Sequence, residues 1–509
     1  MPKHGFESHT STKIKGYVQQ SKLFIWYKKQ PYPVFIFKGV NMSNSFIAAA
    51  RTKETIGRTE NGAKTFISSI DQIVDVFFMM GAVRTTSDSR KNEIINKILT
   101  ICETEPLVGM SLLIYLRDIR NGGLGERDLF RKVVSNQRLV SLYGKERVFR
   151  LAEKTHEFGR FDDLFHFQGI DTIDIIGRLL TDDDYKSLAC KWFPRKGPWF
   201  VRMHKELNKT PKELRKYLVN NSSTVEQKIS SKQYKKMDYS KIPSLAGLKY
   251  IKAFYRNDEL RYKKFIDSVK SGKKKINTSV NVPVDIVKAY LAKSDDSALS
   301  VMWEDMKKKF NLSAKFLPLI DVSSSMSSAG VMDDSISIGM FLAECNNSSL
   351  KDSFITFHER PEMLTVKGDS FGAKYRYVKG SRWGGSTNLI AAFQLILEAT
   401  KASSPADVPD YLIILSDMEF NAACSGITNF QNIKIMYDDA GIKMPQIIFW
   451  NLASRHDNIP VRVNENGVAL VSGKNPAIVK TVLSGDLSPR SVVDRTLNRY
   501  RTITEYVIG

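Results

Sequence analysis

Five oxygen-bearing side chains stand at places in the sequence where they could bind one metal ion together. Asp321, Ser323 and Ser325 occupy alternate positions directly after an apolar run, KFLPLI. Thr387 lies in a second polar segment, and Asp417 directly follows another apolar run, YLIILS. Carboxylate and hydroxyl oxygens are hard ligands that suit Mg²⁺, which keeps several waters and accepts an outside carboxylate or phosphate in an open position. The sequence therefore predicts a site for Mg²⁺, or for another divalent cation, made of these five side chains.

The same residues have more ordinary uses, which compete with metal binding. Serines after a strand can cap a following helix, and aspartates can accept hydrogen bonds from loop amides. Capping alone does not explain why two further segments supply another hydroxyl, on Thr387, and another carboxylate, on Asp417. This coincidence favours the metal site.

Motifs of several common enzyme classes are missing from the sequence. Two residues after Asp321 stands Ser323, where a phosphatase of the haloacid dehalogenase type has a second aspartate. The string GGST at residues 384–387 is not a nucleophile elbow, and no Walker A loop occurs. We therefore expect no enzymatic activity. A nuclease that activates water with Asp321, Asp417 and a metal ion stays open as an alternative.

A second group of candidates has the residue types that contact RNA. Residues 191–217 interleave Trp, Phe and Tyr with Lys, Arg and His. Single-stranded RNA is bound by stacking of its bases on aromatic rings and by pairing of its phosphates with cations. Because aromatic residues of helical proteins usually belong to the core, we base the prediction on the basic residues. The RNA-binding candidates in this segment are Arg195, Lys196, Arg202, His204, Lys205, Arg215 and Lys216.

A glycine-rich turn, NGGLG, supplies three further candidates. Arg120, Arg127 and Arg131 surround it, and bare backbone amides beside guanidinium groups can bind phosphate. The competing interpretation is a tight turn between two helices, in which Arg117 and Arg127 pair with nearby carboxylates. These would be Asp118 and Glu126, or Asp162 and Asp163.

The net charge is unevenly distributed along the chain. The 509 residues include 76 basic and 54 acidic ones, a formal charge of +22. Residues 313–509 hold 19 basic and 20 acidic residues, which leaves 57 and 34 for residues 1–312, a net charge of +23. Excess lysine can serve solubility alone. The electrostatic field of a net charge of +23 also attracts a polyanion, and RNA is the partner that we expect.

Helices must position the candidates that lie before residue 312. Residues 70–80 place apolar side chains three and four positions apart, as on one face of a helix. Similar periods predict further helices at residues 91–102, 106–120, 126–134 and 146–158. Thr210, Pro211 and Glu213 have the spacing of a capping box at the start of a helix over residues 212–220. Many short helices predict a bundle or a solenoid of helix pairs.

After residue 312 apolar strands alternate with helices. The predicted strands cover residues 315–322, 353–357, 411–416, 446–451 and 468–472. Continuous apolar strands separated by helices form a mostly parallel sheet with helices on both faces. Ligands of such sheets bind at the carboxyl ends of the strands, which is where Asp321 and Asp417 stand.

The composition favours a reducing, cytoplasmic location. The four cysteines share no C-x-x-C spacing, and no window approaches the roughly 18 apolar residues of a membrane span, so we expect no membrane contact. Residues 1–42 show no lasting helical or strand period. We interpret them as an unstructured extension, or as a spurious one if Met42 is the true start. Peptides from this segment in mass spectrometry of the native protein would contradict the second interpretation.

The five candidate ligands match a known pattern residue by residue. Asp321, Ser323, Ser325, Thr387 and Asp417 resemble the metal-ion-dependent adhesion site of von Willebrand factor A domains. The resemblance implies a doubly wound, Rossmann-like A domain at residues 313–509 that binds a divalent cation.

Four strings in the helical part are similar to those of the TROVE module of Ro-type ribonucleoproteins. They are TENGAKTF at residues 59–66, DVFF at 75–78, YLRDIRNGGLGERDLFR at 115–131 and GRFDDLF at 159–165. The strings FPRKG and IPSLA are closer to an uncharacterised group of plant, microbial and viral relatives. The resemblance implies a ring of HEAT-like helices at residues 43–312, which binds structured or misfolded noncoding RNA.

We therefore expect a non-catalytic RNA-binding protein of a ribonucleoprotein, with a Mg²⁺-dependent ligand site in the A domain. The alternative is a protein-binding module without RNA, in which the metal captures an acidic side chain of a partner protein. A monomer is compatible with the sequence.

Overall fold

The computed structural model describes residues 56–310, 312, 314–382, 385–422 and 427–509. The predicted extension at residues 1–42, including the proposed start at Met42, lies outside the described residues. What the structure describes contains no helix of sufficient length and apolar character to span a membrane. Cys102, Cys190 and Cys345 are buried and form no disulfide.

A short hairpin opens the described chain, and helices follow it up to residue 308. The hairpin pairs β1 (Ile56–Arg58) with β2 (Lys64–Phe66) in antiparallel register. The first helices are α2 (Gln72–Met80), α3 (Asp88–Thr104), α4 (Pro106–Arg117), α5 (Arg127–Val134) and α6 (Gln137–Phe158). The next are η2 (Phe161–His166), α7 (Ile173–Thr181), α8 (Lys186–Trp192), α9 (Pro198–Glu206), α10 (Pro211–Asn221) and α11 (Val225–Ser230). The last are η3 (Tyr234–Lys236), η4 (Tyr239–Lys241), α12 (Ser244–Lys249), α13 (Ile251–Lys270), α14 (Pro283–Leu291) and α15 (Asp296–Lys308).

Local signals in the sequence fix several of these helix starts. The Asp71 carboxylate accepts hydrogen bonds from the amides of Ile73 and Val74 and so caps α2. At α10 the predicted capping box is confirmed, because the Thr210 hydroxyl accepts from the Glu213 amide while the Glu213 carboxylate accepts from the Thr210 amide. These caps satisfy amide groups that the first turn of a helix leaves without partners.

The helix α4 ends at Arg117, three residues earlier than the sequence predicts. The chain turns instead at Asp118, which is fully buried. The Asp118 carboxylate accepts hydrogen bonds from the amides of Arg120, Asn121 and Gly123 and from the Tyr500 hydroxyl. The glycine-rich turn before α5 is thus organised around one buried carboxylate.

The second part of the chain contains a six-stranded mixed sheet, in which all neighbours but one pair are parallel. The strands are β3 (Phe316–Asp321), β4 (Ser353–Phe357), β5 (Met363–Thr365), β6 (Tyr411–Ser416), β7 (Gln446–Asn451) and β8 (Val468–Ser472). Their order is β5-β4-β3-β6-β7-β8, with β5 antiparallel to β4 at one edge. The prediction of a mostly parallel sheet after residue 312 is confirmed. The short edge strand β5 was not predicted, because its side chains are only partly buried and show no apolar run.

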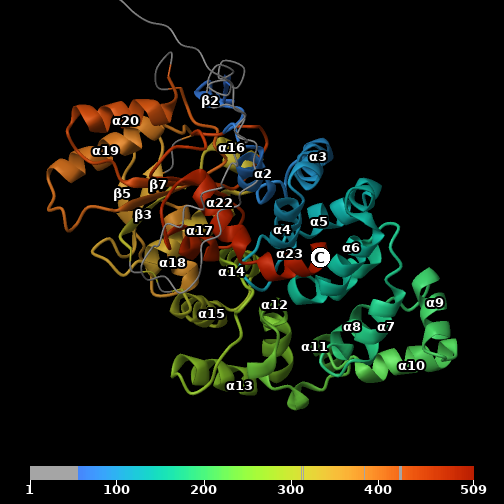
Figure 1. Ribbon diagram of the computed structural model, residues 1–509. Helices are drawn as coiled ribbons and strands as arrows, with labels where there is room; N and C mark the ends of the chain where they lie inside the picture. The colour runs from blue at the N-terminus through green and yellow to red at the C-terminus, as the bar shows by residue number, and fades with distance from the viewer. Residues whose placement is uncertain (1–55, 311, 313, 383–384, 423–426) are drawn as a thin grey trace, which may run out of the picture. The chain divides into compact units, whose positions relative to one another are not determined.

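Helices cover both faces of this sheet. The helices of this part of the chain are α16 (Ser324–Ser328), α17 (Met332–Cys345), α18 (Phe371–Lys379), α19 (Leu389–Lys401), α20 (Asn429–Asp439), α21 (Ala477–Val482), α22 (Pro489–Asn498) and α23 (Arg501–Ile508), of which α23 packs away from the sheet. Figure 1 shows α19 and α20 on one side of the sheet and α17 and α22 on the other. The helix α17 approaches β3 closely at Gly339, where a Cβ atom would lie 2.4 Å from Ile320 Cγ1. Only glycine fits at this contact, which fixes the strand that ends in Asp321.

Elements from the two ends of the described chain pack against the opposite part of the molecule. The N-terminal hairpin exchanges backbone hydrogen bonds between Phe66 and Ile459, and α2 packs on β8. The C-terminal helix α23 packs on α4 and α6 in turn. The first and last described elements therefore hold the helical part and the sheet together, and residues 51–509 form one compact unit. The HEAT-like ring stays a prediction.

Candidate functional site

Four of the five predicted metal ligands form one hydrogen-bonded cluster at the carboxyl ends of β3 and β6. Asp321 ends β3, and its two carboxylate oxygens accept from the Ser323 amide at 2.9 Å and from the Ser416 hydroxyl at 2.6 Å. The hydroxyl oxygens of Ser323 and Ser325 lie 2.9 Å apart. Asp417 directly follows β6, and its carboxylate accepts a hydrogen bond from Ser325.

The two carboxylates of this cluster are buried, and their charges repel. Burial and the neighbouring Asp417 raise the pKa of Asp321 to about 7. Burial also raises the pKa of Asp417, while Ser325 and Arg455 lower it. The cation that contacts Asp417 is Arg455, with 3.1 Å between Nη2 and Oδ2. A divalent cation would offset the repulsion between the carboxylates, so the donor set fits Mg²⁺.

The fifth predicted ligand, Thr387, lies beside the cluster and not in its hydrogen-bond network. Its hydroxyl donates to the carbonyl oxygen of Glu419 at 2.8 Å, and it makes no hydrogen bond to the other four candidate ligands. The loop that carries Thr387 nevertheless lies against the first one, since a Cβ atom on Gly385 would be 3.7 Å from Ser324 Oγ. The preceding Ser386 has a buried hydroxyl without a hydrogen-bond partner among the described residues.

A turn of the N-terminal hairpin contacts Thr387 and the segment that follows Asp417, and the sequence did not predict this contact. The Thr59 hydroxyl donates to the carbonyl oxygen of Phe420, and the Asn61 amide group donates to Thr387 Oγ1 at 3.2 Å and to the carbonyl oxygen of Glu419. More than 320 residues separate the two segments. No local pattern reports such a contact, although the turn lies in the string TENGAKTF that carries part of the family resemblance.

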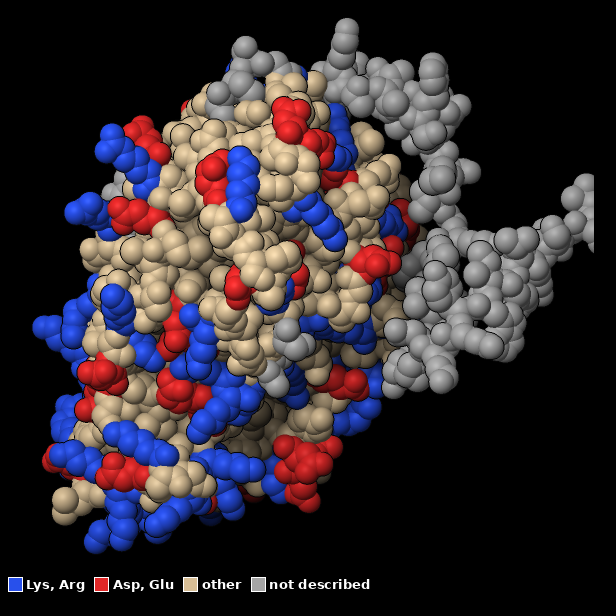
Figure 2. All heavy atoms as spheres, turned by 90° about the vertical axis from the view of Figure 1, so that its left-hand side faces the viewer, with Lys and Arg blue, Asp and Glu red and all other residues tan. Residues whose placement is uncertain are grey.

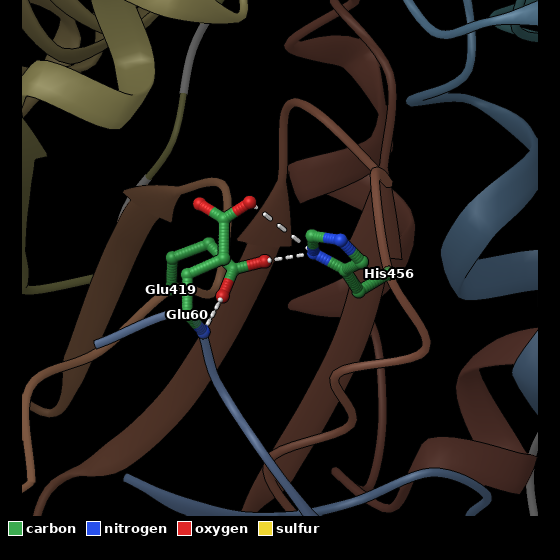
Figure 3. A group of neighbouring side chains, drawn as sticks. All are labelled: Glu60, Glu419 and His456. Atoms are coloured by element: carbon green, nitrogen blue, oxygen red, sulfur yellow. Dashed lines mark hydrogen bonds and ion pairs between the residues drawn. The ribbon is translucent and has the colours of Figure 1, made fainter. Parts of the chain in front are cut away.

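A mixed group of Glu60, Glu419 and His456 lies next to this turn (Figure 3). His456 Nδ1 lies 2.8 Å from Glu419 Oε1 and 3.7 Å from Glu60 Oε1, and the Glu60 amide donates to Glu419 Oε2 at 2.6 Å. Burial raises the pKa of Glu419, while hydrogen bonds from His456 and Glu60 lower it. The ligand types would suit a metal ion, but Arg455 already pairs with both carboxylate oxygens of Glu60 at 3.0 and 2.8 Å. We interpret the group as an ion-pair cluster that anchors the hairpin.

The three arginines of the glycine-rich turn fall into two classes. Arg120 and Arg127 are exposed and form no ion pair with the described residues. Arg131 is engaged instead, because it pairs with Asp162 and with the buried Asp163. The competing interpretation made from the sequence is confirmed for Arg117, which pairs with Asp163, and is wrong for Arg127. Arg120 and Arg127 therefore remain available to an anion.

The seven basic candidates of residues 191–217 lie around α9 and α10. Four of them are exposed and form no ion pair with the described residues: Lys196, Lys205, Arg215 and Lys216. The other three are engaged with neighbours. Arg202 forms an ion pair with Asp171, and both side chains are exposed. Arg195 is half-buried and donates to the Phe193 carbonyl oxygen, and the His204 ring lies near the Phe200 ring.

Among the aromatic residues of this segment, Trp192 offers the most surface. It is 42% exposed, whereas Phe193 and Phe200 are buried. Arg215 lies over the Phe200 ring, 4.9 Å from its centroid. The prediction that most of these rings belong to the core agrees with this arrangement.

Basic residues also gather on another face of the molecule. Figure 2 shows Lys and Arg side chains crowded on the lower half of that face, at the height of α13 and α15 in Figure 1, while both signs mix above. The exposed lysines of α13 and of the segment after it include Lys263, Lys264, Lys270 and Lys273–Lys275. The excess positive charge of residues 1–312 is therefore displayed on more than one surface.

Comparisons with known proteins give matches without an assigned function. A family model described as a domain of unknown function (DUF7788) matches residues 316–499, and a second one (DUF2828) matches residues 175–341. An uncharacterized protein of Acanthamoeba polyphaga mimivirus is 28% identical, over 87% of this chain and 87% of its own length. The crystal structure of the Ro (RSR) protein of Deinococcus radiodurans matches with a TM-score of 0.34. The match covers 85% of this chain and 100% of the Ro chain, with 11% sequence identity. A TM-score of this size does not establish a common fold.

Proposed function

We propose that the chain is a non-catalytic RNA-binding protein whose helical part contacts RNA through the cations of α9 and α10. The observation that carries the proposal is the set of exposed cations without ion pairs: Lys196, Lys205, Arg215 and Lys216. Free cations release the counterions of a nucleic acid on binding, which is the main source of affinity for a phosphate backbone.

The surroundings of these cations also favour single-stranded RNA. The exposed ring of Trp192 at the end of α8 offers a face on which a base can stack. The net charge of +23 before residue 313 raises the local concentration of a polyanion and speeds its association.

The cluster at the ends of β3 and β6 would hold Mg²⁺ in this proposal. Asp321, Ser323, Ser325 and Asp417 would supply its ligands, and Thr387 lies next to them. A bound Mg²⁺ supplies a position for a carboxylate or phosphate oxygen of a partner. The chain's own Arg455 neutralises part of the charge of Asp417, and Asn61 positions Thr387.

A charge-reversal experiment tests the RNA surface. The variant Lys205→Glu, Arg215→Glu, Lys216→Glu changes three exposed cations that no described carboxylate pairs with, so the fold should persist. A matched control, Lys351→Glu, Arg360→Glu, Lys443→Glu, makes the same change of charge on exposed residues of the sheet part.

Binding of a fluorescent structured RNA should separate the two variants. We expect the α9–α10 variant to lose at least about tenfold in affinity at about 0.1 M salt, since each lost phosphate contact lowers the salt slope by about one unit. The control should stay within about twofold of wild type. Equal losses in both variants would show that only the overall charge matters and would contradict the proposed surface.

A further inference from the structure

A cavity of about 350 Å³ lies where the helices α3, α4, α5 and the end of α6 meet. Its lining includes five basic side chains, namely Arg84, Lys91, Arg117, Arg127 and Arg160. It also includes two carboxylates, Glu126 and Asp128. The lining therefore has a formal charge of +3, and the volume is in the range of small-molecule sites.

Both carboxylates of the lining already have a cation of their own. Arg84 Nη2 lies 2.7 Å from Glu126 Oε1, and Lys91 Nζ lies 3.3 Å from Asp128 Oδ2. Arg117 pairs with Asp163, which is not part of the lining, so the uncompensated positive charge of the cavity is left to Arg127 and Arg160. Arg127 and Arg160 form no ion pair with the described residues.

The third arginine, Arg117, belongs to the buried part of the lining. Its side chain is 1% exposed, and its Nε donates to Asp163 at 2.8 Å. Its Nη2 atom is buried and has no hydrogen-bond partner among the described residues. A buried guanidinium with an unused donor is a costly arrangement that an anionic ligand in the cavity would relieve.

The start of α5 adds backbone donors to the same cavity. The helix begins at Arg127 after Glu126, whose side chain does not cap it. The amides of Arg127, Asp128 and Leu129, which all line the cavity, donate to no acceptor among the described residues. Unpaired amides and the positive end of a helix dipole are the usual elements of a phosphate-binding site.

We propose that this cavity binds the phosphate group of a nucleotide-sized ligand. The phosphate oxygens would accept hydrogen bonds from the first amides of α5 and from the side chains of Arg127 and Arg160. The buried Arg117 lines the same cavity. The ligand is either a free nucleotide or the terminal phosphate of an RNA, since both present the same chemistry. The site does not depend on the proposed RNA surface of α9 and α10.

Isothermal titration calorimetry of the full chain with pyrophosphate and with AMP, in a phosphate-free buffer of low ionic strength, tests the site. We expect saturable binding of one ligand per chain. Arg127→Gln and Arg160→Gln should each weaken it by about tenfold, the usual loss for one charge-assisted hydrogen bond. Arg256→Gln in α13 is the matched control, because Arg256 is exposed, forms no ion pair with the described residues and does not line the cavity. It should leave the affinity within about twofold of wild type.

Two results would overturn the proposal: no binding of either compound to the wild-type chain, or equal losses for Arg256→Gln and Arg127→Gln. A further arm measures the affinities of a 5′-phosphorylated oligoribonucleotide and of its 5′-hydroxyl form, both for the wild type and for Arg127→Gln. A phosphate preference that is lost with Arg127 assigns the site to RNA ends, and tight AMP binding without such a preference assigns it to a free nucleotide. Because AMP binding is measured without RNA, it stands even if the α9–α10 surface fails its own test.

Discussion

At the scale of single residues, the buried pair Arg117 and Asp163 joins the end of α4 to η2. Asp163 is fully buried and accepts from Arg117 Nε, from Arg131 Nε and from the Arg160 amide. Burial lowers the pKa of Arg117, and the attraction of Asp163 opposes that effect. One carboxylate thus compensates two guanidinium groups.

Asp163→Asn should destabilise the protein, because it leaves the buried Arg117 without a counter-charge. We expect a loss of about 3 to 5 kcal/mol in the free energy of unfolding, measured by urea denaturation. The control Asp88→Asn removes an ion pair with Lys132 in which Asp88 is exposed to solvent, and it should leave that free energy nearly unchanged. Similar values for the two variants would show that the buried pair has no special role.

Asp321→Asn should abolish stabilisation by Mg²⁺. A ligand that binds only the folded chain stabilises it by about 2.7 kcal/mol at a hundredfold excess over its Kd, and this appears as a rise in Tm. The wild type and the control Asp369→Asn, an exposed residue outside the cluster, should both show the rise. An equal rise in Asp321→Asn would place the metal elsewhere.

The sequence could single out the candidate ligand residues because three short motifs carry them. It could not identify Glu60, Asn61 or Arg455, which contact the cluster or its loops from distant segments. Contacts between residues hundreds of positions apart leave no periodic signal. The cavity cations Arg84 and Arg160 were missed for the same reason, since each lies in a different connection between helices.

At the scale of elements, local periods predicted the helices α2–α6 and α10 and the strands β3, β4, β6, β7 and β8, but they gave no range for α7–α9 or α11–α15. Apolar runs gave β3, β6, β7 and β8 nearly to the residue, because buried parallel strands have continuous apolar sequences. The end of α4 was predicted too late because hydrogen bonds to Asp118, from the amides of the following turn and from the distant Tyr500 hydroxyl, determine it. The hairpin β1–β2 was not predicted, since its strands have only three residues and Phe66 is held by backbone hydrogen bonds to the distant Ile459.

Gly339→Ala should weaken the contact between α17 and the strand that ends in Asp321. The added Cβ would overlap Ile320, and overpacking of this kind costs about 1 to 3 kcal/mol in the free energy of unfolding. We also expect weaker Mg²⁺ binding, because β3 would shift.

Gly247→Ala in α12 is the control for this prediction. It adds the same methyl group where the nearest side-chain atoms lie 3.8 Å away, and it should cost little or even stabilise the helix. Thermal denaturation with and without Mg²⁺ measures both effects. Equal stability of the two variants would contradict the close contact at Gly339.

At the scale of the whole molecule, charge and packing divide the chain differently. The excess of basic residues ends near residue 312, as the sequence indicated. Packing crosses that point, because β1, β2 and α2 lie on the sheet while α23 lies on α4 and α6. The order of secondary structure is readable from a sequence. Which distant elements pack together depends on surface complementarity that periodicity does not record.

The central claim, RNA binding by the free cations of the helical part, is tested most directly by the salt dependence of binding. The purified full chain would be titrated with a pool of structured RNA at several salt concentrations, with and without Mg²⁺. For four phosphate contacts we predict that the logarithm of the affinity falls with the logarithm of the salt concentration with a slope of about −3. Asp321→Asn should leave this slope unchanged. No binding at low salt, or an affinity that does not respond to salt, would contradict the account.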